Sequence, residues 1–370
     1  MLSHTISGGS WQSETDAVND ETGPSVSTSR YLHLVPMTAP PPTMLVLLGT
    51  AGGPLPSPVR SGISQAVVVG GRTYLVDCGS GVTRQLRRAR LLSSLHQAFL
   101  THLHSDHDCD YFNLFLLGWP ILQWNPPVHV YGPGSAGGAG SLPPEDPARP
   151  AALLHPANPT PGLVDLTQAQ FRAHAYDLNI RMREAGRSDL TGLVAPHEIA
   201  VPAGLDARGP DRVAPAMDPI LVAEDDDVRV TATLVRHAPV FPAFAYRFDT
   251  DAGSVVLSGD TAPCPNLVRL AGSADILVHE VFDDAALERG PDEGDDEDAW
   301  EAERRHHHLV TSHTPLSEVG GVAAEAGARR LVLTHFVPGD DTLPDEHWVA
   351  GVGDFEGEVV VGRDLLELTV

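Results

Sequence analysis

Short apolar runs bounded by polar or glycine-rich segments recur along most of the chain, as expected for β-strands. Such runs lie at 44–48, 64–69, 72–77, 97–101, 128–131, 228–235, 243–248, 254–258, 275–282, 330–336 and 364–368. Stretches with a helical pattern lie at 82–90, 166–185 and 313–328. The alternation of the two patterns predicts a globular chain of mixed strands and helices.

The polar segments outside this pattern divide the chain. Residues 1–40 are rich in Ser, Thr, Asp and Glu, which predicts a disordered N-terminal extension before one folded domain at 41–370. Within that domain, Gly, Pro and Ala dominate the start of an expected insertion at about 133–220. Acidic residues crowd an expected solvated loop at about 283–305.

Composition bears on the compartment and on membrane insertion. The chain has 370 residues, 42% of them hydrophobic, but no run of about 18 apolar residues that could cross a bilayer. The N-terminus has no basic segment followed by an apolar stretch, so no signal peptide is expected. Cys78, Cys109 and Cys264 are scattered and odd in number, which argues against disulfides and for the reducing cytoplasm.

Charge bears on the partners. The formal net charge is −25, and the chain contains no lysine, so every basic side chain is Arg or His. A surface of this sign repels nucleic acid unless a local basic patch exists. The charge therefore argues against a nucleic-acid partner.

One cluster of side chains carries metal-binding chemistry. His102, His104, Asp106 and His107 directly follow the predicted strand at 97–101. On an extended backbone, residues i and i+2 point the same way, so His102 and His104 can reach one cation. The following turn can bring Asp106 and His107 to a second cation. A surface loop that is rich in histidine by chance is the alternative, but H-x-H-x-D-H is far more specific than a lone His.

The motif T-H-L-H-S-D-H at 101–107 resembles the signature of the metallo-β-lactamase-fold hydrolases. The glycine-rich turn at 49–54 resembles the first motif of their ribonuclease Z and arylsulfatase-like branch, where glycine permits close backbone approach. The resemblance covers residues 44–368 apart from the insertion. It implies an α/β fold, a four-layer αββα sandwich with a dinuclear metal site at one edge of its two sheets.

The resemblance also assigns the remaining ligands, each of which lies at or near the end of a predicted strand. His237 would complete the first metal site, His335 would complete the second, and Asp260 would bridge the two cations. Zinc fits this nitrogen-rich set best, and manganese or iron are alternatives. The implied ligands are His102, His104 and His237 for the first metal, Asp106, His107 and His335 for the second, and Asp260 for both.

Three residues are expected to act in catalysis: Asp106, His313 and Glu280. His313 opens a segment that resembles the branch's His-Ser-Thr motif, whose histidine is thought to protonate the leaving group. Glu280 lies in a segment that resembles its His-Glu-Ala-Thr motif and could orient His313. The triplet at 306–308, three consecutive histidines, is assigned no metal role.

The expected function is a metal-dependent hydrolase. Water held between two cations loses a proton near pH 7, and the metal-bound hydroxide would attack a small-molecule ester. The ester would be an aryl sulfate, a phosphodiester, or a carboxylic ester or lactone. A tRNA 3′-processing endoribonuclease of the ribonuclease Z type is one alternative. A non-catalytic metal-binding interaction module is the other, although the complete ligand set argues against it. A homodimer is left open.

Two features weigh against the ribonuclease alternative. That class carries a Lys-Arg-Asn-like loop where this chain has Ser-Pro-Val-Arg-Ser at 57–61. It also carries a basic tRNA-binding arm after the third-ligand histidine, whereas the space between His237 and Asp260 is too short for such an arm. Together with the charge, these features favour a small-molecule substrate. A β-lactamase is disfavoured because its second metal site has different spacing.

Overall fold

The computed structural model describes residues 42–147, 149–205, 212–287 and 299–370. The chain divides into two units, Met1–Ala39 and Pro40–Val370, and the first lies outside the described residues. The predicted disordered extension and residues 288–298 of the predicted acidic loop therefore lie outside them as well. No helix in the described ranges is long and apolar enough to cross a membrane.

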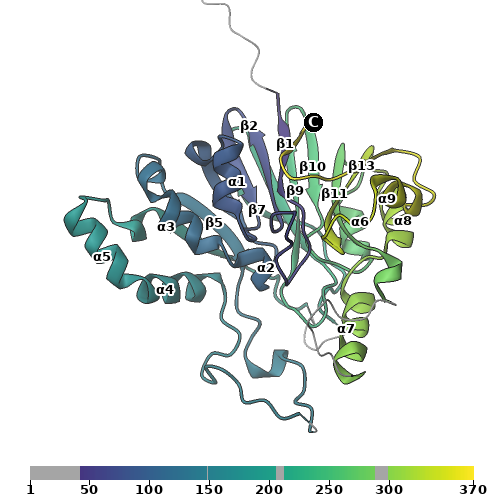
Figure 1. Cartoon of the computed structure of the whole chain (residues 1–370), viewed down its shortest axis with the longest axis horizontal. Helices are drawn as coiled ribbons and strands as arrows, with labels where there is room; N and C mark the ends of the chain where they lie inside the picture. Colours follow the sequence, from purple (N-terminus) through teal and green to yellow (C-terminus); the bar gives the residue numbers. More distant parts are fainter. Residues whose placement is uncertain (1–41, 148, 206–211, 288–298) are drawn as a thin grey trace, which may run out of the picture. The chain divides into compact units, whose positions relative to one another are not determined.

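Two seven-stranded mixed sheets form the centre of the second unit (Figure 1). The first sheet has the order β14 (Leu366–Thr369), β1 (Met44–Gly49), β2 (Ser64–Val69), β3 (Arg72–Val76), β4 (Leu95–Phe99), β5 (Val128–Pro133) and β6 (Val194–Ile199). The second has the order β13 (Glu358–Val361), β12 (Arg330–Val337), β11 (Ile276–Phe282), β10 (Gly253–Leu257), β9 (Phe244–Thr250), β8 (Val228–Leu234) and β7 (Ile220–Glu224).

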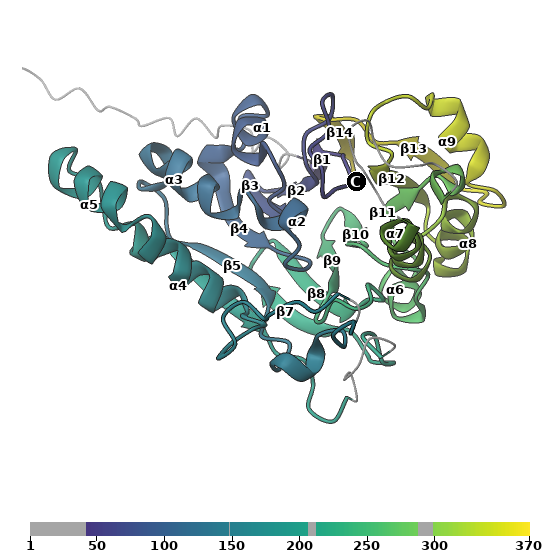
Figure 2. The same cartoon turned by 60° about the horizontal axis from the view of Figure 1, so that its bottom comes forward.

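Helices cover the outer face of each sheet (Figures 1 and 2). Those on the side of the first sheet are α1 (Val82–Arg88), α2 (Ser105–Asp108), α3 (Tyr111–Leu122), α4 (Leu163–Ala173) and α5 (Ala175–Glu184). Those on the side of the second sheet are α6 (Pro265–Leu270), α7 (Ala299–Ser312), α8 (Leu316–Ala326) and α9 (Asp345–Gly351). Single 3₁₀ turns lie at η1 (Leu92–Ser94), η2 (Ala139–Ser141), η3 (Leu190–Gly192) and η4 (Asp284–Leu287).

Three apolar clusters account for the layering. In β1, Leu45 and Leu47 pack into the cluster between the two sheets, whereas Val46 and Leu48 pack into the cluster under the helices of the first sheet. A strand that is buried on both faces needs a continuous apolar run, which is what residues 44–48 supply. A third cluster lies between the second sheet and α6, α8 and α9. The predicted four-layer αββα sandwich is confirmed.

Three predicted segments differ in the structure. The helix expected at 313–328 begins only at Leu316, because Pro315 is extended and caps it, which leaves His313 in the short turn between α7 and α8. The helix expected at 166–185 is two helices that meet at His174. Residues 299–305 of the expected acidic loop form the first turns of α7.

Candidate metal centre

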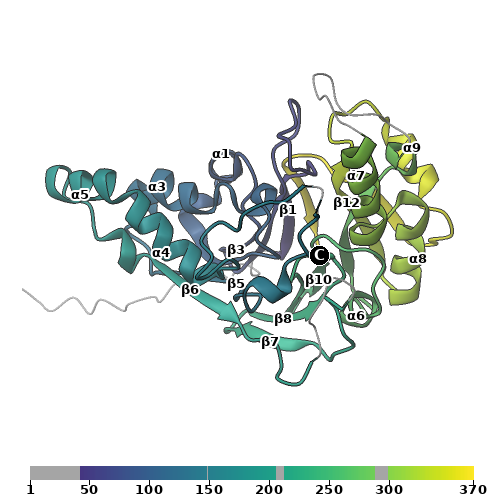
Figure 3. The ribbon, with the colours of Figure 1, turned by 90° about the horizontal axis from the view of Figure 1, so that it is seen from below.

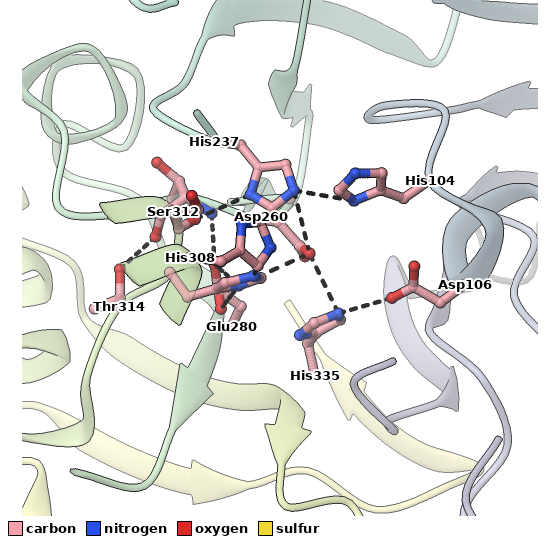
Figure 4. Close-up of polar contacts among 12 residues, drawn as sticks. His104, Asp106, His237, Asp260, Glu280, His308, Ser312, Thr314 and His335 are labelled. Carbon is pink, nitrogen blue, oxygen red and sulfur yellow. Dashed lines mark hydrogen bonds and ion pairs between the residues drawn. The ribbon is translucent and has the colours of Figure 1, made fainter. Parts of the chain in front are cut away.

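The seven predicted ligands all lie at one edge of the two sheets, although they come from segments far apart in the sequence. His102 and His104 occupy the turn that follows β4, and Asp106 and His107 lie on the short helix α2. The remaining three belong to the second sheet: they are His237 after β8, Asp260 after β10 and His335 in β12. Figure 4 shows that side chains from the first-sheet side, such as His104 and Asp106, point toward side chains from the second-sheet side, such as His237 and His335.

His102, His104 and His237 form the first group. Their ligand atoms all lie within 4.8 Å of one another. His237 Nε2 is 3.2 Å from His104 Nδ1. Two nitrogens bound tetrahedrally to one zinc ion at 2.0–2.1 Å would lie roughly 3.3 Å apart. This group can therefore hold one cation with little movement.

Asp106, His107, Asp260 and His335 form the second group, also within 4.8 Å of one another. His335 Nε2 is 3.4 Å from an oxygen of Asp106 and 3.4 Å from an oxygen of Asp260. His107 Nε2 is 3.2 Å from the other oxygen of Asp260. The separations again match those of ligands that share one metal.

Asp260 lies between the two groups. Besides its contacts in the second group, its Oδ2 is 4.0 Å from both His102 Nε2 and His237 Nε2. Burial alone would raise the pKa of this carboxyl, but the nearby His107 and His335 hold it well below its usual range. Asp260 is thus an ionised carboxylate within reach of both groups.

The chemistry of the buried atoms fits a cation. Among the described residues, His102 Nε2 is buried and has no hydrogen-bond partner, and His107 Nε2 and Asp260 Oδ1 are buried 3.2 Å from each other, with no hydrogen bond to any other group. Unpaired buried polar atoms are costly and rare in folded proteins. Burial also lowers the pKa of His102 and His237 well below the usual range, so both rings are neutral, the form that binds metal.

Two ligand rings, those of His107 and His237, are hydrogen-bonded to other groups through the nitrogen that faces away from the site. His107 Nδ1 is 2.8 Å from Asp77 Oδ2, and His237 Nδ1 is 3.0 Å from the Ser312 carbonyl, to which it donates. Asp77 is also fixed, because it accepts hydrogen bonds from the backbone N–H and the hydroxyl of Thr101. Such partners fix the ring orientation and raise the basicity of the ligand.

Asp77→Asn is expected to weaken cation binding in the second group by about 10–100-fold, because the amide no longer holds His107 as a carboxylate does. Competition with a chelator measures the change. Asp225→Asn is the matched control, since Asp225 accepts hydrogen bonds from Tyr74 and lies away from the seven ligands. Equal cation affinity in Asp77→Asn and the unchanged protein would show that Asp77 has no orienting role.

The glycine-rich turn after β1 lies against the second group. A Cβ at Gly53 would lie 2.3 Å from the Cβ of Asp106, closer than any side chain tolerates. Glycine at this position therefore lets the turn approach the site closely.

His313 and Glu280 lie beside the two groups and contact each other. His313 Nδ1 is 3.0 Å from one carboxylate oxygen of Glu280 and 2.9 Å from the other. Glu280 is itself fixed by a hydrogen bond from the backbone N–H of Thr261. Both side chains are buried, and burial lowers the pKa of His313 and raises that of Glu280. The structure thus pairs the two residues, with Nε2 of His313 on the side away from the carboxylate.

Sequence analysis missed His308, which α7 brings to the same site. Its Nε2 is 3.3 Å from His313 Nε2, and its ring centroid is 5.6 Å from that of His237 (Figure 4). Burial lowers the pKa of His308 to about 4. His237, His308 and His313 also form a group whose ligand atoms lie within 4.8 Å of one another. The only signal in the sequence was its position five residues before His313, and the triplet at 306–308 was assigned no metal role.

His279 is buried beside the site and gives a pH-dependent stability. Burial lowers its pKa to about 4, although its Nδ1–H donates to the Glu280 carbonyl at 2.7 Å. In the unfolded chain the histidine side chain has a pKa of about 6.5. Between about pH 4 and 6.5 the folded state therefore binds fewer protons at His279 than the unfolded state does. Folding stability should therefore fall by up to about 3 kcal/mol as the pH drops from 6.5 to 4.

Urea midpoints of the unchanged protein and of His279→Gln across this pH range measure the contribution of His279. The His279→Gln protein should lose less stability on acidification, whereas substitution of the exposed His306 by Gln should leave the pH dependence unchanged. Parallel pH profiles for the unchanged protein and His279→Gln would contradict the prediction.

Comparisons with known proteins identify the family of the chain. The family model described as the metallo-beta-lactamase superfamily matches residues 60–304. A protein named Ribonuclease Z from Mycobacterium bovis (strain BCG / Pasteur 1173P2) is 31% identical over 331 residues, which cover 88% of this chain and 98% of that protein. Another Ribonuclease Z, from Mycobacterium avium (strain 104), is 32% identical over 331 residues, with the same coverage.

Solved structures share the fold. The short form of human tRNase Z has a TM-score of 0.56 at 22% identity and covers 88% of this chain and 99% of its own. The metallo-beta-lactamase fold protein YhfI from Bacillus subtilis also has a TM-score of 0.56, at 18% identity, and covers 89% of this chain and all of its own.

These comparisons correct the expected partner. Sequence analysis predicted a small-molecule substrate and argued against nucleic acid, because of the net charge of −25 and the missing arm. Relatives that match nearly their whole length are named as ribonucleases, so this prediction is wrong. The net charge averages over the whole surface, whereas an RNA substrate meets only the surface around one site.

Proposed function

The chain belongs to the metallo-beta-lactamase superfamily, and on this premise we propose that it is a ribonuclease that cleaves tRNA precursors at the 3′ end of the tRNA. The observation that carries the proposal is the placing of Asp260 between two groups of ligands. This arrangement suits a two-metal phosphodiesterase, in which paired cations act on the attacking and leaving oxygens. The similarity to ribonucleases supplies the substrate class.

In this proposal, the first group holds one divalent cation and the second group holds another. His102, His104 and His237 would hold the first, Asp106, His107 and His335 would hold the second, and Asp260 lies within reach of both. Zinc suits the nitrogen-rich set, with manganese or iron as alternatives. When bound, the two cations would supply a water molecule with a pKa near 7 and positive charge to stabilise the reacting phosphate.

The chain's own residues would then protonate the leaving group. Attack of water on the phosphorus breaks the bond to the 3′ oxygen, which leaves as the 3′-hydroxyl of the tRNA once it gains a proton. His313 is the proposed donor of this proton, from Nε2, because Glu280 holds its Nδ1. Asp106 orients the reacting groups from the second group of ligands, where it contacts His335.

The decisive assay uses purified protein loaded with zinc or with manganese. Substrates are a tRNA precursor with a 3′ trailer, an aryl sulfate, a bis-aryl phosphodiester, a lactone and a carboxylic ester. We expect cleavage of the precursor at the end of the mature tRNA, leaving a 3′-hydroxyl. An active preparation that hydrolyses one of the small esters but leaves the precursor intact would refute the proposal.

A further inference from the structure

Helix α7 carries a set of basic and aromatic side chains that lead away from the metal centre. Trp300, Arg304 and His308 recur every four residues, and Arg305 precedes His308 by three, so all four lie along one side of the helix. We call these four residues the α7 strip. Its inner end is His308, which contacts His313, and its outer end is Trp300.

The outer end of the strip is held by the segment that follows β5. The Trp300 indole N–H donates to Asp146 at 3.1 Å. The guanidinium of Arg149 lies over the Trp300 ring, 4.3 Å from its centroid, and that of Arg304 lies 5.4 Å from it. Arg149 also pairs with Glu301 at 3.6 Å. These contacts fix the direction of α7 relative to the site.

The composition of the strip suits RNA. Neighbouring arginine side chains are typical of surfaces that bind the phosphate backbone of nucleic acid. Arg304 and Arg305 are consecutive positive charges in a chain whose net charge is −25 and which has no lysine. Four residues of helix span about 6 Å, so a strand that leaves the metal centre past His308 meets Arg304 and Arg305 next.

The segment between two of the ligands does not supply an arm that could bind RNA. Between His237 and Asp260 the chain forms only β9, β10 and their short connections, so no arm projects there. We propose that the α7 strip binds the RNA backbone next to the cleaved bond, with Arg304 and Arg305 on phosphates and His308 on the phosphate nearest the metal centre. This inference rests on the proposed function, because it supplies the RNA contacts that such a function requires.

The test compares binding of a fluorescent mature tRNA by the full chain and by the double variant Arg304→Ala/Arg305→Ala, with salt varied from 50 to 200 mM. The double variant should bind about 10-fold more weakly, and its slope of log affinity against log salt should be shallower by about 1–2. The matched control is Arg172→Ala/Arg183→Ala, which removes two exposed arginines from α4 and α5, on the side of the molecule away from α7 (Figures 1 and 3). The control should bind as the unchanged protein does.

Cleavage is measured in parallel so that the two proposals can fail separately. The double variant should lose about 10-fold in kcat/KM for the tRNA precursor relative to its kcat/KM for a bis-aryl phosphodiester, with the metal content unaltered. If the unchanged protein cleaves the precursor but the double variant binds tRNA as tightly as the unchanged protein does, only the proposed role of the α7 strip is overturned. Binding that depends on Arg304 and Arg305 without cleavage would support the strip and overturn the proposed function. Absence of tRNA binding at 50 mM salt, or equal loss in the control, would also overturn the strip.

Discussion

Asp260→Ala is expected to lose both metal ions and to lower the rate of tRNA precursor cleavage by more than about 10³-fold. This effect exceeds the 10–100-fold typical of losing a group that only orients a ligand. The reason is geometric, because Asp260 contacts His107 and His335 at 3.2 and 3.4 Å and lies 4.0 Å from His102 and His237. Removal of one side chain therefore takes a ligand from each group. Elemental analysis of the purified variant, together with a cleavage assay, measures both losses.

The matched control for this experiment is Asp260→Asn, which keeps an oxygen donor of the same size and position. It should retain more metal than the alanine variant, because one oxygen can still serve one of the two groups. If the Asp260→Ala protein kept two metal equivalents and its activity, Asp260 would be an ordinary turn residue and the proposed bridge would be wrong.

His313→Ala is expected to keep both metal ions and the fold but to cleave the tRNA precursor about 10²–10⁴-fold more slowly, the usual loss for a general acid. The structure supports this role because Glu280 holds Nδ1 of His313 at 2.9–3.0 Å. The loss should shrink for a bis-nitrophenyl phosphodiester, since nitrophenolate leaves as a stable anion and needs little protonation. Comparison of the two substrates separates proton donation from other roles.

His335→Ala is the control for that comparison. It removes a ligand of the second group, so it should lose metal and activity whatever the leaving group. Loss of metal from His313→Ala would make His313 a ligand, which the group formed by His237, His308 and His313 permits. An equal loss of rate for good and poor leaving groups would point to positioning of the substrate instead of proton transfer.

Local pattern predicts the individual strands, whereas the sandwich and the set of seven ligands were expected from the resemblance of the motif at 101–107 to the metallo-β-lactamase-fold hydrolases. Continuous apolar runs such as 44–48 mark strands that are buried on both faces. His237 follows β8 and Asp260 follows β10, and these two strands run in the same direction on either side of β9, so both residues reach one edge of the sheet. His102, His104, Asp106 and His107 lie within six consecutive residues after β4, so the first sheet brings all four of its ligands to the same place.

Other features of the site depend on packing that no local pattern records. His335 is an extra residue in β12, because Thr334 lies opposite Glu280 and Phe336 lies opposite Val281. Its φ of 49° is rare outside glycine and turns the ring out of the strand's regular alternation. A regular strand would be expected from the sequence, since nothing in residues 330–336 marks the bulge.

The role of α7 could not be predicted for a similar reason. Its first residues were assigned to the acidic loop at about 283–305, so no helix was expected there. The helix is positioned by single contacts to distant segments, such as Trp300 with Asp146 and His308 with His313. The partner was mispredicted because the net charge of the whole chain was applied to one local surface.

The most direct test of the account is an anomalous diffraction map of crystals of the zinc-loaded protein, with data collected on both sides of the zinc absorption edge. The account predicts two peaks in this map. One should lie between His102, His104 and His237, the other between Asp106, His107 and His335, and Asp260 should be bound to both. A single peak, or a peak centred between His237, His308 and His313, would contradict it.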